Sequence, residues 1–487
     1  MSASNLMLLS WVLPIIGAIG IGLCGRHPNV RETVTLVTAG ILLVIVYSLL
    51  PSIIAGERPE YTLFEIFPDL TIAFKLEPLG MLFACIASML WPINSIYSIG
   101  YMRGNNESKQ TRFYICFAIA ISSTIGIAFS ANLLTLFIFY ETLTLSTYPL
   151  VTHKGNDEAK RSGRIYLGIL LTTSICLLLP AIVWVYSLTG TTTFTEGGIL
   201  PVTTNKIVLL SLFLLFAYGI GKAALMPVHR WLPAAMVAPT PVSALLHAVA
   251  VVKAGVFSIV KIMTYIFSPA ILTEHIDVNY VLYLSGFTIV AASVVALQAD
   301  NLKRRLAYST ISQLSYVILA TAILAPLSIL GAALHILAHA FGKITLFFAA
   351  GSIYTATHKK LVSELDGIGY RMPITMAAFA VGSLSMIGVP PTAGFVSKWY
   401  ILQGAFSAES LFAVAIIVIS TLLNAGYFLP IVYRAFLRKP ANETDYKINE
   451  APLPIVIALS FTALMTILLF FIPDVALSLL QPWMESL

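Results

Sequence analysis

A single carboxylate stands deep inside an apolar run of this sequence. Glu141 lies in NLLTLFIFYETLTLSTYPLV, a stretch that is otherwise uncharged. A charge near the middle of a bilayer costs from about 2.5 to more than 10 kcal/mol, so such a residue usually faces other helices and marks an ion or proton path. A polar clamp between two helices is the structural alternative. The run favours an ion- or proton-exchanging carboxylate.

Two lysines stand in apolar segments that glycine and proline interrupt. Lys222 lies in FAYGIGKAALMPVHRWLP and Lys398 in IGVPPTAGFVSKWYIL. Proline removes a backbone donor, and membrane helices tolerate this where the freed groups line a cavity. Snorkelling of the long side chain toward the membrane surface is the alternative for both lysines. We expect both lysines to lie at broken helices and to exchange protons.

A further apolar segment, APTPVSALLHAVAVVKAGVF, carries His247 and Lys253. Their spacing of six residues is about 240° around a regular helix, so they share a face only where the helix is irregular. A break at the Pro239/Pro241 end of the segment would supply that irregularity. Either side chain could then face the same path.

A stripe of titratable side chains is predicted in LHILAHAFGKITLFF. His335, His339 and Lys343 follow i, i+4, i+8 spacing, which stacks them over about 12 Å of one helix face. Zinc binding by the two histidines is the alternative, although no acidic or cysteine ligand is near in sequence. Histidine titrates near neutral pH, so the stripe favours proton exchange over metal binding.

The composition places these residues in a membrane protein. Of the 487 residues, 58% are hydrophobic and only 10% are charged, with a mean hydropathy of +0.90. Soluble domains carry about 25% charged residues, so a water-soluble particle is excluded, as are disordered and collagen-like chains. Apolar runs of about 20 residues indicate spanning helices rather than the short alternating strands of an outer-membrane barrel.

Fourteen spans follow from the apolar runs. The first starts after an uncharged MSASNLM without a cleavage-site pattern, so we expect it to be retained. The predicted spans are 6–24, 33–55, 78–99, 113–130, 132–152, 165–188, 207–227, 240–265, 279–299, 305–325, 327–354, 373–399, 411–433 and 453–480.

The basic residues give the orientation of these spans. Of 28 Lys and Arg, 20 fall in connections after odd-numbered spans and only 3 in connections after even-numbered ones. By the positive-inside rule the odd connections are cytoplasmic and both termini lie outside. The pI of about 9.0 therefore reflects topology, and no nucleic-acid partner is expected.

The interrupted spans recur at a fixed interval. Those that carry Lys222 and Lys398 are the seventh and the twelfth, and the eighth carries the Pro239/Pro241 pair. Interrupted helices at matching positions point to inverted repeats, here spans 4–8 and 9–13 with helices 7, 8 and 12 broken. We predict an all-α polytopic membrane protein with segments 1–111, 112–270, 271–440 and 441–487.

Cofactor chemistry has no support in the sequence. The four cysteines form no CxxC pair and lie in or at the ends of apolar spans, where buried cysteine acts as a small hydrophobe. Nucleotide-binding, HExxH and haem motifs are absent from the sequence. We expect neither a metal nor a cofactor.

The stretch KAALMPVHRWLPAAMVAPTPVSALLHAVAVVKAGVF at 222–257 closely resembles the antiporter-like subunits of respiratory complex I, membrane-bound hydrogenases and Mrp-type sodium/proton antiporters. GVPPTAGFVSKWY resembles the span-12 motif of the same family, and the resemblance covers the whole chain. It implies that Glu141 and Lys222 are the coupling pair, that Lys253 is the lysine of span 8, and that Lys398 is the terminal charged residue of the path. The alanines that follow WLP depart from the acidic residue often found there.

Within the family, Glu in span 5 with Lys in spans 7, 8 and 12 is similar to the D-type component of Mrp antiporters. Complex I offers one component that is larger, with a long lateral helix, and another that typically has Glu at the Lys398 position. The resemblance implies a proton-translocating subunit of a multi-subunit Na⁺/H⁺ antiporter, with K⁺ as the other candidate cation. Such a protein is a secondary transporter of pH homeostasis in the bacterial inner membrane. The alternative is a proton-pumping subunit of a hydrogenase or NADH:quinone oxidoreductase; a scaffold without transport is disfavoured by the intramembrane Glu and Lys.

Overall fold

Helices make up most of the chain in this computed structural model, which describes residues 2–67, 70–267, 269–275, 279–440 and 446–485. Without water, backbone polar groups must be satisfied within each segment, so long apolar runs become helices. The helices of the first half are α1 (Ala3–Leu23), α2 (Pro28–Ile54), α3 (Pro78–Gly104), α4 (Gln110–Ala128), α5 (Leu133–Val151), α6 (Asp157–Thr173), α7 (Leu179–Thr189), α8 (Lys206–Gly219), α9 (Trp231–Ala234), α10 (Thr240–Ala244) and α11 (Val251–Ile262). Those of the second half are α12 (Pro269–His275), α13 (Asn279–Gln298), α14 (Leu302–Ala322), α15 (Pro326–Thr357), α16 (Ile368–Arg371), α17 (Pro373–Ile387), α18 (Ala393–Ser407), α19 (Leu411–Leu437), α20 (Leu453–Phe471) and α21 (Asp474–Glu485).

Each of the fourteen predicted spans corresponds to one helix or to one interrupted run of helices. Eleven helical runs in the described residues are long and apolar enough to cross a membrane. The three remaining spans are the short apolar α8, the less apolar α14 and the pair α17 and α18. The prediction of an all-α polytopic membrane protein is confirmed.

All three predicted broken helices are broken in the structure. After α8 the chain forms a 3₁₀ turn at Gly221–Ala223 and continues irregularly to α9. A π-helical turn, Leu245–Val249, separates α10 from α11. Residues 388–392 separate α17 from α18. The division into inverted repeats and its boundaries remain a prediction.

The break in the eighth span lies at a different place from the expected one. Pro239 and Pro241 stand at the N-cap and in the first turn of α10, where proline is tolerated because its missing N–H would be unsatisfied anyway. The irregularity falls instead on the π-helical turn and on Ala250, with φ −114° and ψ −74°. The expectation of a proline-induced break here was wrong.

Two other departures concern the ends of spans. The twelfth span continues through α18 to Ser407, so Lys398 lies within a helix and not near a span end. Between α2 and α3 an unpredicted hairpin forms from β1 (Glu60–Phe67) and β2 (Leu70–Lys75), paired antiparallel from Glu60–Lys75 to Phe67–Leu70. The alternation of apolar and polar residues in EYTLFEIF is the signal that could have found it.

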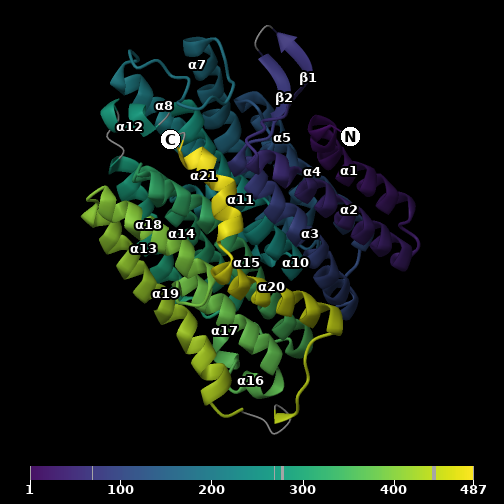
Figure 1. The fold of residues 1–487 in the computed structure, drawn as a ribbon. Coiled ribbons are helices and arrows are strands. Elements are labelled where there is room, and N and C mark those ends of the chain that lie inside the picture. Colours follow the sequence, from purple (N-terminus) through teal and green to yellow (C-terminus); the bar gives the residue numbers. More distant parts are fainter. Residues whose placement is uncertain (1, 68–69, 268, 276–278, 441–445, 486–487) are drawn as a thin grey trace.

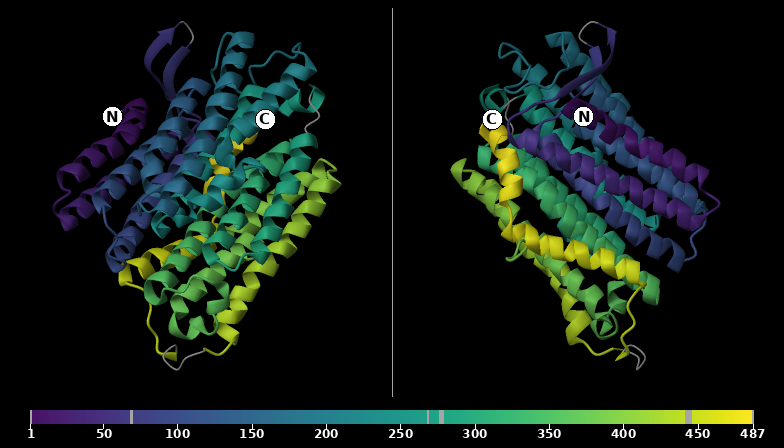
Figure 2. Two further views of the ribbon diagram at one scale, coloured as in Figure 1. Left: turned by 180° about the vertical axis from the view of Figure 1, so that it is seen from behind. Right: turned by 45° about the vertical axis from the view of Figure 1, so that its right-hand side comes forward.

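The long helix α15 lies at the centre of the bundle. It packs against α3, α10, α14, α17, α18 and α20. Of the residues in its most apolar 18-residue stretch, 94% are buried. The helices lie inclined side by side (Figure 1), and both views of Figure 2 show the two marked chain ends toward the same end of the bundle as the β hairpin. An even number of membrane-spanning segments places both ends of the chain on the same side of the membrane.

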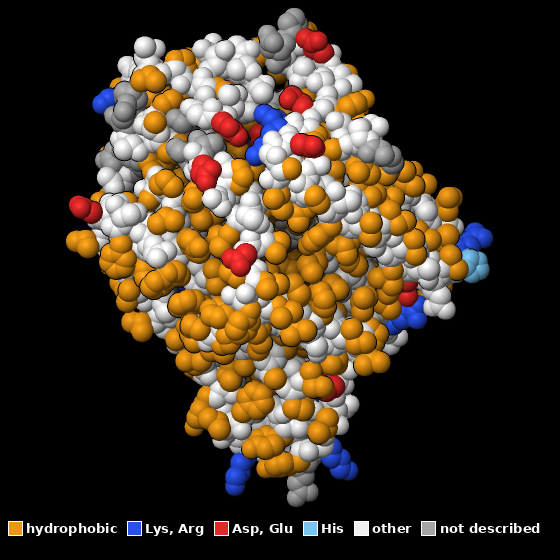
Figure 3. All heavy atoms as spheres, in the orientation of Figure 1, with side chains coloured by type: hydrophobic (Ala, Val, Ile, Leu, Met, Phe, Trp, Pro, Cys, Tyr) orange, Lys and Arg blue, Asp and Glu red, His pale blue; other side chains and the backbone are white. Residues whose placement is uncertain are grey.

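Apolar side chains form a broad band over the face shown in Figure 3. Most carboxylates on this face lie toward its upper end, and Lys and Arg side chains lie at the lower tip, at the right-hand rim and at a few places near the upper end. A belt of this kind is what a lipid-facing surface requires. The chain is therefore a multi-pass membrane protein.

Candidate functional site

Lys222 is fully buried at the break after α8. Its ammonium donates to the Tyr140 carbonyl oxygen and to the Thr144 hydroxyl, both at 2.6 Å, and its backbone N–H donates to the Tyr140 hydroxyl at 3.0 Å. The break allows the side chain to reach α5 because residues 220–224 leave the helical path. Snorkelling does not describe Lys222, since its charge lies inside the bundle.

Glu141 follows Tyr140 on α5 but forms no ion pair within 4.0 Å in the described part of the chain. Both of its carboxylate oxygens are buried and lack a hydrogen-bond partner among the described residues. The predicted partner Lys222 is held instead by neutral oxygens of the same helix. A carboxylate that clamps two helices together would accept hydrogen bonds from the neighbouring helix. The geometry of Glu141 therefore argues against the polar clamp.

Gly255 lets α11 pack closely against the turn that carries Lys222. This residue of α11 packs directly against the backbone of Lys222 and Ala223, where a side-chain carbon would overlap the chain. Only glycine permits such an approach. The helix that carries Lys253 therefore lies against the turn that carries Lys222.

Lys253 joins the stripe of α15. Its Nζ lies 2.6 Å from Nδ1 of His339, and both side chains are buried. His247 lies in the π-helical turn with its ring 4.7 Å from that of Phe347 on α15. Neither nitrogen of His247 has a hydrogen-bond partner within the described residues. The contact between Lys253 and His339 thus connects α11 with α15.

The stripe of α15 is present as predicted, and partners from α14 and α18 hold it. His335 lies between Ser397 and Gln313, with Nδ1 2.9 Å from the Ser397 hydroxyl and Nε2 3.0 Å from the side-chain amide oxygen Oε1 of Gln313. Its ring centre lies 6.1 Å from that of His339. Lys343 donates to the Ser309 hydroxyl at 2.6 Å. Ser397 directly precedes Lys398, so His335 links the stripe to the twelfth span.

Lys398 turns inward toward the end of α17. Its ammonium donates to the carbonyl oxygens of Met386 at 2.8 Å and Ile387 at 3.0 Å, and only 6% of the residue is exposed. Carbonyls at a helix C-terminus lack partners within the helix and attract cations. The break in the twelfth span therefore supplies the hydrogen-bond acceptors of its lysine. Lys398 points into the bundle and does not extend toward the membrane surface.

We expect Gly388→Ala to disturb Lys398 directly. Gly388 has φ +91°, and a Cβ there would lie 2.7 Å from Cδ of Lys398, so alanine adds backbone strain and displaces the lysine. Gly56→Ala is the matched control, because Gly56 has φ +92° with nothing within 4 Å. Both variants should lose about 1 kcal/mol of stability, while only Gly388→Ala loses transport. Equal transport in the two variants would contradict the close contact.

Sequence reasoning missed a buried ion pair near the hairpin end of the bundle. Lys261 on α11 lies 3.0 Å from Glu77, with side chains 0% and 3% exposed, and its ammonium donates to the Ser130 carbonyl oxygen at 2.7 Å. Lys75, partly exposed, lies 3.9 Å from the same carboxylate. The signal was available, because Lys261 is charged within an apolar run and Glu77 begins one.

The described geometry defines a class of protein: a polytopic membrane protein with buried titratable side chains contributed by several helices. The chain matches the family model described as NADH:quinone oxidoreductase/Mrp antiporter, transmembrane, over residues 130–424. It is 31% identical over 441 residues to the N-type subunit of NADH-quinone oxidoreductase from Desulforudis audaxviator, covering 89% of this chain and 87% of that protein. The chain belongs to the NADH:quinone oxidoreductase/Mrp antiporter family.

Similarity extends to the A-type component of the Na⁺/H⁺ antiporter from Alkalihalophilus pseudofirmus, which is 29% identical over 86% of this chain. The chain spans only 55% of the length of that relative. Among solved structures, a chain of the archaeal membrane-bound sulfane sulfur reductase has a TM-score of 0.88 at 21% identity, covering 99% of this chain and 97% of that one. A chain of the Mrp complex from Dietzia sp. has a TM-score of 0.86 at 19% identity, covering 100% and 99%. These two likenesses establish the shared fold.

Proposed function

We propose that the chain is the proton-translocating subunit of a multi-subunit monovalent cation/proton antiporter, similar to the D-type component of Mrp complexes. Protons pass between Glu141, Lys222, Lys253, His339, His335 and Lys398, with His247 and Lys343 supporting the path. The observation that carries the proposal is the contact chain from Lys253 through His339 and His335 to Ser397, beside Lys398. The protein itself catalyses no covalent reaction and needs no cofactor.

The proposed setting is the bacterial inner membrane with both termini outside. The partners are the other subunits, the lipid bilayer, protons, and Na⁺ or K⁺. The presence of a Na⁺/H⁺ antiporter subunit among the relatives supports Na⁺ as the cation and other subunits as partners.

A second candidate is a proton-pumping membrane subunit of a redox complex. The specific observation in its favour is the length match to the N-type subunit of NADH-quinone oxidoreductase, of which 87% is aligned. The proposed path through the chain is the same in both cases, and only the driving reaction differs. Redox subunits that copurify with the chain would favour this candidate, whereas small membrane subunits alone would favour the antiporter.

Everted vesicles that contain the intact complex test the proposal. Respiration generates a ΔpH, a fluorescent probe follows it, and Na⁺ and then K⁺ are added. We expect cation-induced dequenching in the wild type and at least a tenfold smaller response in Lys222→Ala. The variant lacks the ammonium group in the turn at Gly221–Ala223, and the proposed path would therefore be interrupted there. A wild type without any cation response would overturn the antiporter and favour the redox-driven pump.

A further inference from the structure

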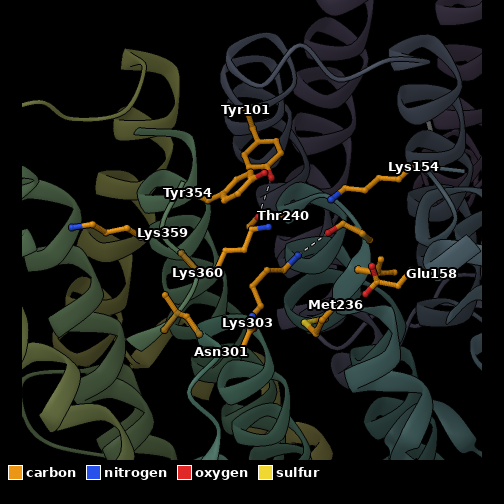
Figure 4. Close-up of a pocket in the computed structure, with 14 residues that line it drawn as sticks. Tyr101, Lys154, Glu158, Met236, Thr240, Asn301, Lys303, Tyr354, Lys359 and Lys360 are labelled. Atoms are coloured by element: carbon orange, nitrogen blue, oxygen red, sulfur yellow. Dashed lines mark hydrogen bonds between the residues drawn. The ribbon is translucent and has the colours of Figure 1, made fainter. Parts of the chain in front are cut away.

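A pocket of about 210 Å³ opens at the end of the bundle that the basic connections mark as cytoplasmic. It lies where α3, the segment before α10, the start of α14 and the end of α15 meet (Figure 4). The residues discussed above for the proton path do not line it. The role of its lining residues must therefore be considered separately from the proton path.

The lining is strongly cationic. Four lysines and one glutamate, Glu158, contribute to it. Figure 4 shows Lys154 and Lys303 directed toward one another across the space and Lys360 reaching in beside Thr240, whereas Lys359 points outward. The three inward lysines come from three separate parts of the chain: the connection after α5, the first turn of α14 and the connection after α15. Folding has thus gathered like charges around one cavity.

No carboxylate pairs directly with these three ammonium groups among the described residues, although Glu107 lies near enough to interact electrostatically with Lys154 and Lys303. In the part of the chain that the structure describes, no ion pair within 4.0 Å involves Lys154, Lys303 or Lys360. Lys303 donates to the Ala238 carbonyl oxygen at 2.7 Å, and Lys360 lies 5.2 Å from the centre of the Tyr354 ring. An ammonium has three N–H donors, and the bond of Lys303 to Ala238 satisfies only one of the nine within the residues that the structure describes.

We propose that this pocket binds a phosphate group, either the headgroup of an anionic phospholipid or free phosphate. A phosphate offers several acceptor oxygens and negative charge to three converging ammonium groups, which bind it as point charges. Cations and protons are repelled from the same space. Basic pockets between membrane helices on the cytoplasmic side hold lipid headgroups in this way. The Thr240 and Tyr101 hydroxyls, 3.4 Å apart, supply neutral polar groups at the inner side.

Such an anion would stabilise the eighth span at its start. Thr240 is the first residue of α10, directly before the π-helical turn that carries His247. A ligand that binds only the folded state raises stability in proportion to the logarithm of its concentration over its Kd. The bound phosphate would therefore tie α10 to α14 and α15.

The test compares the intact complex with a variant in which Lys154, Lys303 and Lys360 are all replaced by Gln. Lys160→Gln is the control, since Lys160 is an exposed lysine of α6 paired with Asp157 at 3.6 Å. One arm measures thermal stabilisation by inorganic phosphate in detergent. The other measures, by native mass spectrometry, phosphatidylglycerol retained against phosphatidylcholine.

We expect saturable stabilisation or selective lipid retention in the wild type and the control, and loss of both in the triple variant. Retention alone identifies the headgroup, and stabilisation alone identifies free phosphate. If the triple variant does not assemble, Lys154→Gln and Lys360→Gln are tested singly, and each should weaken binding about tenfold. Equal binding by wild type and variants, or no binding of either probe to the wild type, overturns the proposal.

Discussion

Glu141→Gln should abolish cation-linked proton transport without weakening the fold. The substitution keeps the shape of the side chain and removes its ability to titrate. Because both carboxylate oxygens lack hydrogen-bond partners among the described residues, no structural bond is lost. We expect transport in everted vesicles to fall at least tenfold while the thermal stability of the complex stays unchanged. Asp157→Asn is the control, since that carboxylate is fully exposed on α6.

The companion variant Glu141→Leu separates a functional from a structural role. Removing a buried polar group without a partner stabilises a protein by about 1–3 kcal/mol. Glu141→Leu should therefore melt at a higher temperature than the wild type and be inactive. A lower melting temperature in both variants would restore the helix-clamp interpretation, and full transport in Glu141→Gln would remove this residue from the path.

The largest loss of stability is expected at the buried pair of Glu77 and Lys261. Lys261→Met leaves the Glu77 carboxylate buried without its nearest cation, which costs about 3–5 kcal/mol. Lys75→Met should cost less than about 1 kcal/mol, because that lysine is partly exposed and 3.9 Å away. Thermal or denaturant unfolding of the purified complex measures both effects.

A double variant completes this comparison. Replacing the pair by Glu77→Gln with Lys261→Met removes both charges, and replacing both members of a buried pair is often neutral. We expect most of the stability lost in Lys261→Met to return. A double variant as unstable as the single one would show that the Lys261 bond to the Ser130 carbonyl, and not the ion pair, stabilises this region.

Much of the fold could be predicted because its determinants are local. Runs of about 20 apolar residues define the spans, and glycine with proline marks the breaks near Lys222 and Lys398. The α15 stripe follows from helical spacing alone. The same local signals identified every titratable residue of the proposed path, since each is polar in an apolar run.

The partners of those residues could not be predicted, because they come from distant helices. His335 is held by Gln313 on α14 and Ser397 on α18, 22 and 62 residues away. Lys222 was expected to pair with Glu141, yet its ammonium bonds to Tyr140 and Thr144 on the same helix. These residues lie within about one turn of Glu141 on α5, so the prediction depended on which way each side chain points around that turn. The π-helical turn at His247 likewise has no sequence signal comparable to proline.

The four lysines of the proposed path share one feature: neutral carbonyl, hydroxyl or imidazole groups contact their ammonium groups. No carboxylate lies within 4.0 Å of any of them in the described chain. At an effective dielectric of about 20, two like charges repel by about 1.4 kcal/mol even when they are about 12 Å apart, and this energy corresponds to a tenfold bias against charging both sites. In the proposed path, this repulsion would leave the row of lysines with fewer protons than it has sites. A proton that enters at one end would fill an unoccupied site, and the unoccupied position would then shift toward the other end as protons move along the row.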